Sequence, residues 1–388
     1  MENSILFKNA RIVTMMGLIP SGWLLLEGKT ITRIGTGIAP EFPTAQVVDA
    51  QDNTLLPGFI DLHVHGAVGY ECMDASRESL EHMAQFYAQH GVTSFLATTW
   101  TASRVQIWDA LNQIAACQGQ INNGASLLGA HLEGPYLNPV RCGAQDSSQI
   151  RRADREEALG FLDLNVIRLL ALAPEFTENQ WLVTECVRRG ITVSAAHTAA
   201  SYEDMEQAVE LGLTQTTHTF NAMTALNHRL PGTVGAAMDF SSLNCELIAD
   251  NVHVHPAVMR ILLAAKGSDK IILISDAVRG AGLPPGSTYQ QDGRTISVTQ
   301  DRVNLPDGTL AGSSLTMDRA LANFKHASRR PLEEIWQVSS LNAARAIHIS
   351  HQKGSIEVGK DADLVLVDEN INVQLTIAEG RIVYQKGK

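Results

Sequence analysis

Residues 56–66 read LPGFIDLHVHG, and this stretch sets the fold that we predict for the chain. A Pro-Gly turn signal precedes an apolar run that is too short for a typical helix, and the run ends in His63 and His65. Residues i and i+2 of a strand point to the same face, so both imidazoles would converge at the strand's C-terminal end. Converging neutral imidazoles are typical metal ligands, although an isolated His-x-His pattern also occurs on ordinary surface strands.

The middle of the chain alternates strand-like runs with segments of helical spacing. Leu80, Met83, Ala84 and Tyr87 recur at i, i+3, i+4 and i+7, and Ser201 opens a capping box before another helix. After residue 276 a long polar insertion precedes helices expected at 314–328 and 332–347. Such alternation predicts an α/β fold, a (β/α)8 barrel of the TIM type. Its eight expected strands cover residues 58–65, 92–99, 126–133, 167–173, 191–197, 214–221, 245–253 and 270–276.

Both ends of the chain contain short strand-like runs separated by Gly, Asn and Pro. Neither end is long enough for a comfortable core of its own. We therefore expect residues 1–56 and 351–388 to pair into one small β-sandwich domain, and residues 57–350 to form the barrel domain.

Composition excludes several classes of partner. The 388 residues carry a formal net charge of −11, which argues against nucleic acid or an anionic membrane surface. No apolar run approaches the length of a membrane span, and residues 1–5 lack the pattern of a signal peptide. The five cysteines show no Cys-x-x-Cys spacing and read as reduced thiols. We expect a cytoplasmic protein.

Ligand-type residues gather at the predicted strand ends, where a barrel carries its active site. Glu133, His197 and His218 supply two imidazoles and one carboxylate, a common catalytic zinc set whose fourth ligand is water. Asp276 would then be a general base that takes a proton from water and later gives it to a leaving nitrogen. Each residue alone has a structural explanation, but together they predict a metal-dependent hydrolase. The six residues are His63, His65, Glu133, His197, His218 and Asp276.

The chain also resembles a known family, the N-acetylglucosamine-6-phosphate deacetylases of the amidohydrolase superfamily, over essentially its whole length. The resemblance rests on the order and combination of eight motifs, which lie at residues 57–66, 131–135, 194–197, 217–223, 231–232, 248–253, 275–277 and 310–315. The resemblance implies a metal-bearing barrel, a small β domain from both termini, and a homodimer.

The resemblance also implies roles for individual residues. Glu133, His197 and His218 match the primary metal ligands, and Asp276 matches the general base. His63 and His65 match a pair that holds a second metal ion in some members. We accordingly expect one or two divalent ions per subunit, with zinc as the expected metal.

Other positions match residues that contact the substrate. The resemblance implies that Asn221 and Ala222 offer backbone or amide contacts, and that Arg229 and His253 bind the phosphate. At least part of that phosphate site would come from the neighbouring subunit. One position departs from the pattern, because many members carry a histidine where this chain has Gln145. An amide can donate one hydrogen bond to a developing oxyanion, but it cannot be cationic.

The expected reaction is hydrolysis of the acetamide of N-acetyl-D-glucosamine 6-phosphate. N-acetyl-D-galactosamine 6-phosphate is the nearest alternative substrate, since the sequence does not reveal which epimer is preferred. A cyclic amidase of the dihydroorotase or hydantoinase type is a weaker alternative, because residues 167–175 lack the lysine that this group carries at the end of strand four. A non-catalytic protein that binds metal or sugar phosphate is the alternative from another class, and the presence of Asp276 argues against it.

Overall fold

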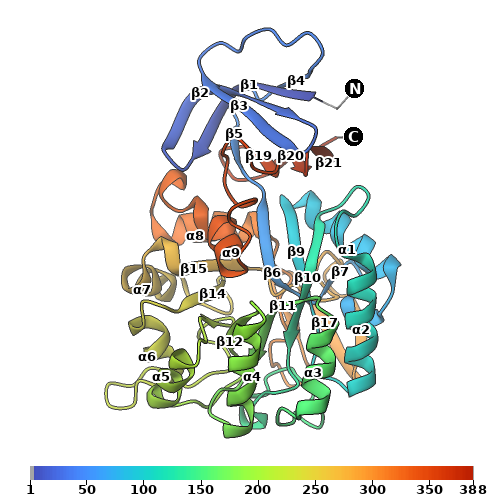
Figure 1. Ribbon diagram of the computed structural model, residues 1–388, viewed down its shortest axis with the longest axis vertical. Coiled ribbons are helices and arrows are strands. Elements are labelled where there is room, and N and C mark those ends of the chain that lie inside the picture. Colours follow the sequence, from blue (N-terminus) through green and yellow to red (C-terminus); the bar gives the residue numbers. More distant parts are fainter. Residues whose placement is uncertain (1–3, 388) are drawn as a thin grey trace.

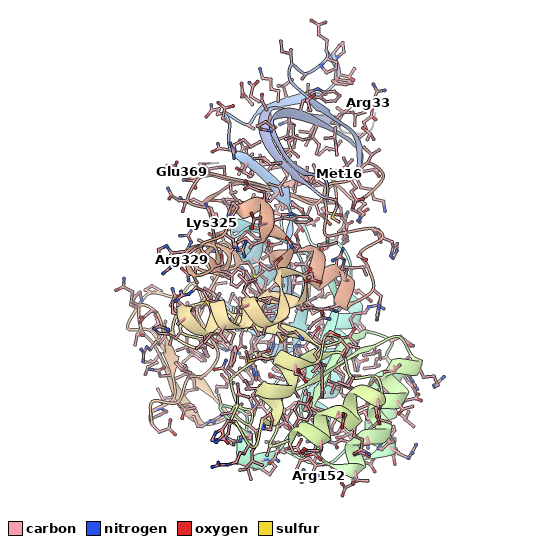
Figure 2. The ribbon with its side chains drawn as sticks, turned by 90° about the vertical axis from the view of Figure 1, so that its left-hand side faces the viewer. Met16, Arg33, Arg152, Lys325, Arg329 and Glu369 are labelled. Carbon is pink, nitrogen blue, oxygen red and sulfur yellow. The ribbon has the colours of Figure 1, made fainter. Side chains whose placement is uncertain are left out.

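The computed structural model describes residues 4–387, which form a barrel and a separate sheet built from both ends of the chain (Figure 1). The sheet lies beyond the end of the barrel at which β6 begins. Figure 2 shows Arg152 at the far end of the molecule from Arg33, which lies in the terminal sheet, and from Met16, which lies in a turn between two of its strands.

Eight parallel strands form the barrel in the order β15-β14-β13-β12-β11-β10-β9-β6. All eight overlap the strands expected from the sequence, so the predicted fold class is confirmed. Most of their residues are buried, because helices or barrel interior cover both faces of a parallel strand. The strands are β6 (Phe59–Val64), β9 (Val92–Thr98), β10 (Ser126–Glu133), β11 (Ile167–Leu172), β12 (Thr192–Ala195), β13 (Gln215–Thr216), β14 (Asn244–Ile248) and β15 (Ile271–Ile274).

The barrel closes where the end of β6 meets the segment after β15. Val64 and Ala277 form a parallel bridge. The His65 amide donates to the Ala277 carbonyl at 2.8 Å, and the Asp276 amide donates to the His63 carbonyl at 2.9 Å. Closure therefore fixes the backbones of His63, His65 and Asp276 against one another.

Helices alternate with the barrel strands along the chain. The apolar positions expected in α1 are buried, and Ser201 caps α5 in a reciprocal capping box with Asp204. Within residues 4–387, no helix combines the length and apolar character that crossing a bilayer requires. The helices are α1 (Arg77–Gln89), α2 (Arg104–Cys117), α3 (Arg155–Asp163), α4 (Thr177–Arg188), α5 (Tyr202–Glu210), α6 (Gly232–Asp239), α7 (Pro256–Lys266), α8 (Met317–Ser328) and α9 (Leu341–Ala346).

Three expected elements are shorter or more broken than predicted. Strand six ends at Thr216 because the backbone turns away at His218, and strand seven ends at Ile248, before a turn at Asn251. The helix expected at 332–347 divides into the 3-10 turns η4 (Leu332–Glu334) and η5 (Trp336–Ser339), followed by α9. Non-helical backbone at Ile335 and Ser340 interrupts it, in a segment whose β-branched residues and serines have low helix propensity.

The terminal sheet has the order β21-β20-β19-β5-β1-β2-β3, with β4 beside β1. The two chain ends meet where β19 pairs antiparallel with β5. The sheet has a hydrophobic cluster of its own, and its residues Val13, Leu56, Val365 and Val367 pack into the core of the barrel. The division between residues 56 and 57 stays a proposal. The strands are β1 (Ser4–Thr14), β2 (Gly17–Glu27), β3 (Thr30–Thr36), β4 (Gln46–Asp49), β5 (Thr54–Pro57), β19 (Leu364–Val367), β20 (Val373–Ala378) and β21 (Arg381–Gln385).

The polar insertion after Asp276 folds as a small antiparallel sheet of β16 (Thr288–Gln291), β17 (Arg294–Val298) and β18 (Val303–Asn304). Ile296 and Val303 of this sheet pack in one cluster with Trp100 and Ala144, which lie beside the strand ends. The insertion therefore covers one side of the region where the ligand-type residues gather. The remaining short elements are β7 (Gly66–Ala67), β8 (Tyr70–Glu71), η1 (Cys72–Asp74), η2 (Pro139–Arg141) and η3 (Ser268–Lys270).

A buried lysine joins the terminal sheet to the barrel. Lys353 Nζ lies 2.9 Å from Asp361, 2.7 Å from Asp363 and 3.3 Å from Glu379, and its side chain is 5% exposed. Glu379 also accepts a hydrogen bond of 3.0 Å from Ser126, the first residue of β10. A second contact joins the two parts of the molecule at α8, where Lys325 donates to the Glu369 carbonyl at 3.5 Å. Both residues are labelled in Figure 2.

We predict that Lys353→Met lowers the free energy of unfolding by about 3–5 kcal/mol, because it leaves buried carboxylates without a cation. Urea denaturation measures the change. Lys8→Met is the matched control, because it breaks an ion pair on the surface. Lys8 lies 3.5 Å from Asp49, and the two side chains are 43% and 42% exposed. This substitution should leave the midpoint of urea denaturation nearly unchanged. Equal effects of the two substitutions would contradict the prediction.

Candidate active site

Ligand-type side chains meet at the C-terminal ends of the barrel strands. His63 belongs to β6 and Glu133 ends β10, whereas His197, His218 and Asp276 follow β12, β13 and β15. All five side chains are buried, as is that of His65. Five of the six residues line a cavity of about 380 Å³: His65, Glu133, His197, His218 and Asp276.

The two carboxylate oxygens of Glu133 face different pairs of histidines. Glu133 Oε1 lies 3.2 Å from Nε2 of His197 and 3.2 Å from Nε2 of His218. Glu133 Oε2 lies 3.2 Å from Nε2 of His65 and 3.6 Å from Nε2 of His63. The residues therefore form two three-residue groups of potential metal ligands that share one carboxylate.

Hydrogen bonds on the outer ring nitrogens turn the imidazole lone pairs inward. His197 Nδ1 lies 2.9 Å from the Arg141 carbonyl, which only accepts, so in the neutral ring this nitrogen carries the hydrogen and Nε2 is free to bind a cation. The same reasoning applies to His63 Nδ1, which lies 3.2 Å from the Glu246 carboxylate. Nε2 atoms lie 3.2 Å apart in each pair, His63 with His65 and His197 with His218. Lone pairs crowded against a carboxylate fit a bound cation.

Several residues of the site have a left-handed backbone conformation. Positive φ angles occur at His197 (43°), His218 (32°), Asp276 (50°) and Ala222 (52°), although none of them is glycine. Such conformations cost on the order of 1–3 kcal/mol each and persist only where the surroundings impose them. They end the strands and turn these residues toward the cavity.

The carboxylates of the site are ionised. Burial alone raises the pKa of Glu133, but the charge of His63 and hydrogen bonds from His197 and His218 outweigh it and hold that pKa well below its ordinary value. Burial likewise raises the pKa of Asp276, and the neighbouring His63 and His65 bring it below its ordinary value. Asp276 Oδ1 lies 3.4 Å from Nε2 of both histidines.

Gln145 contacts a metal-ligand candidate directly. Its Oε1 accepts from the Thr101 amide at 2.8 Å, and its Nε2 donates to Glu133 Oε2 at 2.8 Å. The side chain is buried at the wall of the cavity. One of its two amide hydrogens is therefore committed to Glu133, and the other is available to a bound substrate.

Three of the four remaining sequence candidates line the same cavity: Asn221, Ala222 and His253. His253 Nδ1 lies 2.6 Å from Asp250 Oδ2. Burial lowers the pKa of His253, but the contact with Asp250 outweighs it and raises that pKa above the ordinary value. His253 is thus poised to be cationic, which suits contact with an anion.

Arg229 is placed differently. It lines a neighbouring cavity of about 470 Å³, and Arg141 borders both cavities. Arg229 is exposed, and the nearby Leu226 and Leu230 are 55% and 76% exposed. Within one subunit, the structure does not bring Arg229 into the cavity that holds the ligand candidates.

Sequence reasoning missed two residues that orient the histidines. Glu246 on β14 is fully buried and contacts His63, and Trp100 stacks on His65 with ring centroids 3.9 Å apart. The sequence did contain a signal for Glu246, because a charged residue within an otherwise apolar strand segment indicates a specific partner in the core. Trp100 follows the expected end of strand two, where side chains reach the active-site face.

Comparison with known proteins extends over almost the whole chain. The amidohydrolase family profile matches residues 54–383. An N-acetylglucosamine-6-phosphate deacetylase of Bacillus subtilis (strain 168) is 37% identical, over 99% of this chain and 98% of that protein. An N-acetylgalactosamine-6-phosphate deacetylase of Escherichia coli O157:H7 is 33% identical, over 94% of this chain and 97% of that protein.

Solved structures agree with this result. The crystal structure of N-acetylglucosamine-6-phosphate deacetylase from Pasteurella multocida superposes with a TM-score of 0.92 at 32% identity, over 98% of this chain and 99% of that one. Both sequence and structure therefore place this chain in the amidohydrolase family of metal-dependent hydrolases, within the group that contains the N-acetylglucosamine-6-phosphate deacetylases.

Proposed function

We propose that this enzyme hydrolyses the acetamide of N-acetyl-D-glucosamine 6-phosphate to D-glucosamine 6-phosphate and acetate. The observation that carries the proposal is the pair of ligand groups sharing Glu133, with Asp276 beside them at the strand ends. Relatives that match nearly the full chain are deacetylases of this class of sugar phosphate.

The metal that we propose is zinc, held by Glu133, His197 and His218, with His63 and His65 completing a second position on the other oxygen of Glu133. Two imidazoles and a carboxylate form a common catalytic zinc set. When bound, the ion would lower the pKa of water and polarise the amide carbonyl.

The chain's own residues move the proton. In the proposed reaction Asp276, ionised and 3.4 Å from the inner nitrogens of His63 and His65, accepts a proton from the attacking water. It then returns that proton to the nitrogen as the C–N bond breaks, so acetate and a free amine leave. Gln145, held by Thr101 and Glu133, would offer its free N–H to the developing oxyanion.

The proposed phosphate site combines His253 of one subunit with Arg229 of its partner in a homodimer. His253 lines the catalytic cavity, whereas Arg229 lies outside it on an exposed loop flanked by Leu226 and Leu230. A two-fold contact through this loop would bury the two leucines and place the guanidinium near the partner's cavity. Asn221 and Ala222, at the cavity wall, are the proposed contacts for the sugar.

The proposed location is the cytoplasm, which the five free cysteines support, since disulfides are rare there. N-acetyl-D-galactosamine 6-phosphate remains the second candidate substrate, because a relative of 33% identity acts on that epimer by name. The cyclic-amidase alternative lacks the lysine that this group carries at the end of strand four, since residues 167–175 contain none.

Acetate release from a panel of N-acetyl sugars, each with and without a 6-phosphate, tests the proposed function. We expect the highest kcat/KM with the N-acetylglucosamine phosphate. A higher value with the galactosamine epimer would reassign the substrate. No turnover of any sugar by metal-loaded protein would favour a binding protein instead.

We predict that Glu133→Gln protein retains much less divalent metal than wild type, because both ligand groups lose their shared anionic ligand. Elemental analysis after dialysis measures the metal per subunit. Glu157→Gln is the control, since this buried glutamate of α3 pairs with Arg151 and touches no histidine of the site. Full activity of wild-type protein stripped of metal would refute the metal requirement.

We predict that Asp276→Asn keeps metal and substrate binding but loses about 10²–10⁴-fold in kcat, because an amide cannot accept and return the proton. Steady-state kinetics and metal analysis on the same preparation separate the two effects. A variant within a few-fold of wild type would remove Asp276 from this role.

We predict that Arg229→Ala mainly raises KM for the phosphorylated sugar, since the phosphate lies away from the breaking bond. The lost charge-assisted contact is worth about 1.5–3 kcal/mol, so the ratio of kcat/KM for phosphorylated over unphosphorylated sugar should fall about 10–100-fold. Arg104→Ala, which removes an exposed arginine of α2, should leave this ratio unchanged.

Mixed dimers decide whether Arg229 acts across the interface. Neither Arg229→Ala nor Asp276→Asn protein alone should reach wild-type activity. If Arg229 serves the partner's site, a heterodimer of the two variants contains one intact site and regains activity on mixing. If Arg229 serves its own subunit, no site is intact and mixing restores nothing.

A further inference from the structure

We propose that Glu246 is a positioning residue that sets the affinity of the group His63, His65 and Glu133 for a second divalent metal ion. The inference rests on the proposed two-ion site and adds a residue that does not itself ligate. Glu246 lies on β14, two strands away from β6 across the closed barrel.

The carboxylate of Glu246 is surrounded by donors. Its Oε2 lies 3.2 Å from His63 Nδ1 and 3.2 Å from the backbone nitrogen of His218, and its Oε1 accepts from Gln215 Nε2 at 2.6 Å. The residue is 0% exposed, and His63 is its only ion-pair partner among residues 4–387. The carboxylate of Glu246 thus contacts both the imidazole of His63 on β6 and the backbone of His218, which follows β13.

These contacts fix the chemical state of His63. A carboxylate accepts hydrogen bonds, so in the neutral, metal-binding form of His63 the hydrogen stays on Nδ1 and Nε2 presents a lone pair. That Nε2 lies 3.2 Å from His65 Nε2 and 3.6 Å from Glu133 Oε2. A carboxylate behind a ligating imidazole also raises the basicity of the ligand and holds its ring in place.

Packing does not account for a glutamate at this position. Cys245 and Leu247, its neighbours along β14, are buried apolar residues of the barrel core, and their side chains point to the opposite face of the strand. An apolar residue would leave the Gln215 amide and the His218 backbone nitrogen without an acceptor. A neutral acceptor could serve those two donors, so they do not by themselves require a charged side chain. The acidic group is therefore better explained by what it does to His63.

The effect is expected to fall on one metal position more than on the other. His197 is oriented independently by the Arg141 carbonyl. His65 has no hydrogen-bond partner for its buried Nδ1 and is held by stacking on Trp100. His63 is thus the ligand of the second position whose orientation depends on a carboxylate.

The test is a titration of metal-free wild-type and Glu246→Gln protein with Zn²⁺, followed by calorimetry and by elemental analysis. Gln keeps the size of the side chain but places an N–H among neighbours that already donate, which favours the wrong tautomer of His63. We expect the weaker of two dissociation constants to rise about 10–100-fold. The tighter constant should change by less than about threefold.

Glu157→Gln is the matched control, because it neutralises a buried glutamate bonded to Arg151 and Tyr136, away from the ligands. Both dissociation constants for zinc should equal those of wild type in this variant. This should hold even if thermal unfolding shows that the metal-free variant is less stable. The contrast separates an effect on metal from an effect on stability alone.

Three results would overturn the inference. In the first, both constants weaken equally in Glu246→Gln protein, as a structural role predicts. In the second, neither constant changes. In the third, wild type takes up only one zinc ion under excess, which removes the second position but leaves the deacetylase function, judged by acetate release, untouched.

Discussion

The convergence of four imidazoles on the carboxylate of Glu133 is the constraint on which the rest of the site depends. Each oxygen faces one histidine pair at 3.2–3.6 Å, so in their neutral forms the rings turn their lone pairs toward one place beside the carboxylate. The arrangement exists because parallel strands end at one face of a barrel, so residues far apart in sequence present side chains to one cavity. Barrel closure between His63 and Asp276 completes it.

Maintaining this geometry requires support from outside the ligand set. The positive φ angles of His197, His218 and Asp276 are unfavourable, and the buried strands on either side hold them in place. Outer contacts supply the remaining precision: a carbonyl behind His197, Glu246 behind His63 and the ring of Trp100 against His65. The second layer of residues is therefore as much part of the site as the ligands.

Charge poses a second problem, because a chain of net charge −11 repels a phosphate dianion. In the proposed phosphate site His253 would supply a local positive charge, and its contact with Asp250 raises the pKa of the imidazole. Arg229 lies outside the cavity of its own subunit, so a partner chain is the natural route by which it reaches a substrate. Under this proposal, recognition of the phosphate depends on formation of the dimer.

The sequence alone determined the barrel and located six ligand-type residues at its strand ends, because strand and helix periodicities and a His-x-His spacing are local features. It overextended strand six to Asn221, since nothing local reveals the turn at His218. Only the tertiary structure revealed that Gln145 binds Glu133, that Glu246 contacts the outer nitrogen of His63 and that Arg229 lies outside the catalytic cavity. His63 and Glu246 are separated by 183 positions, and such contacts exist only once the barrel has closed.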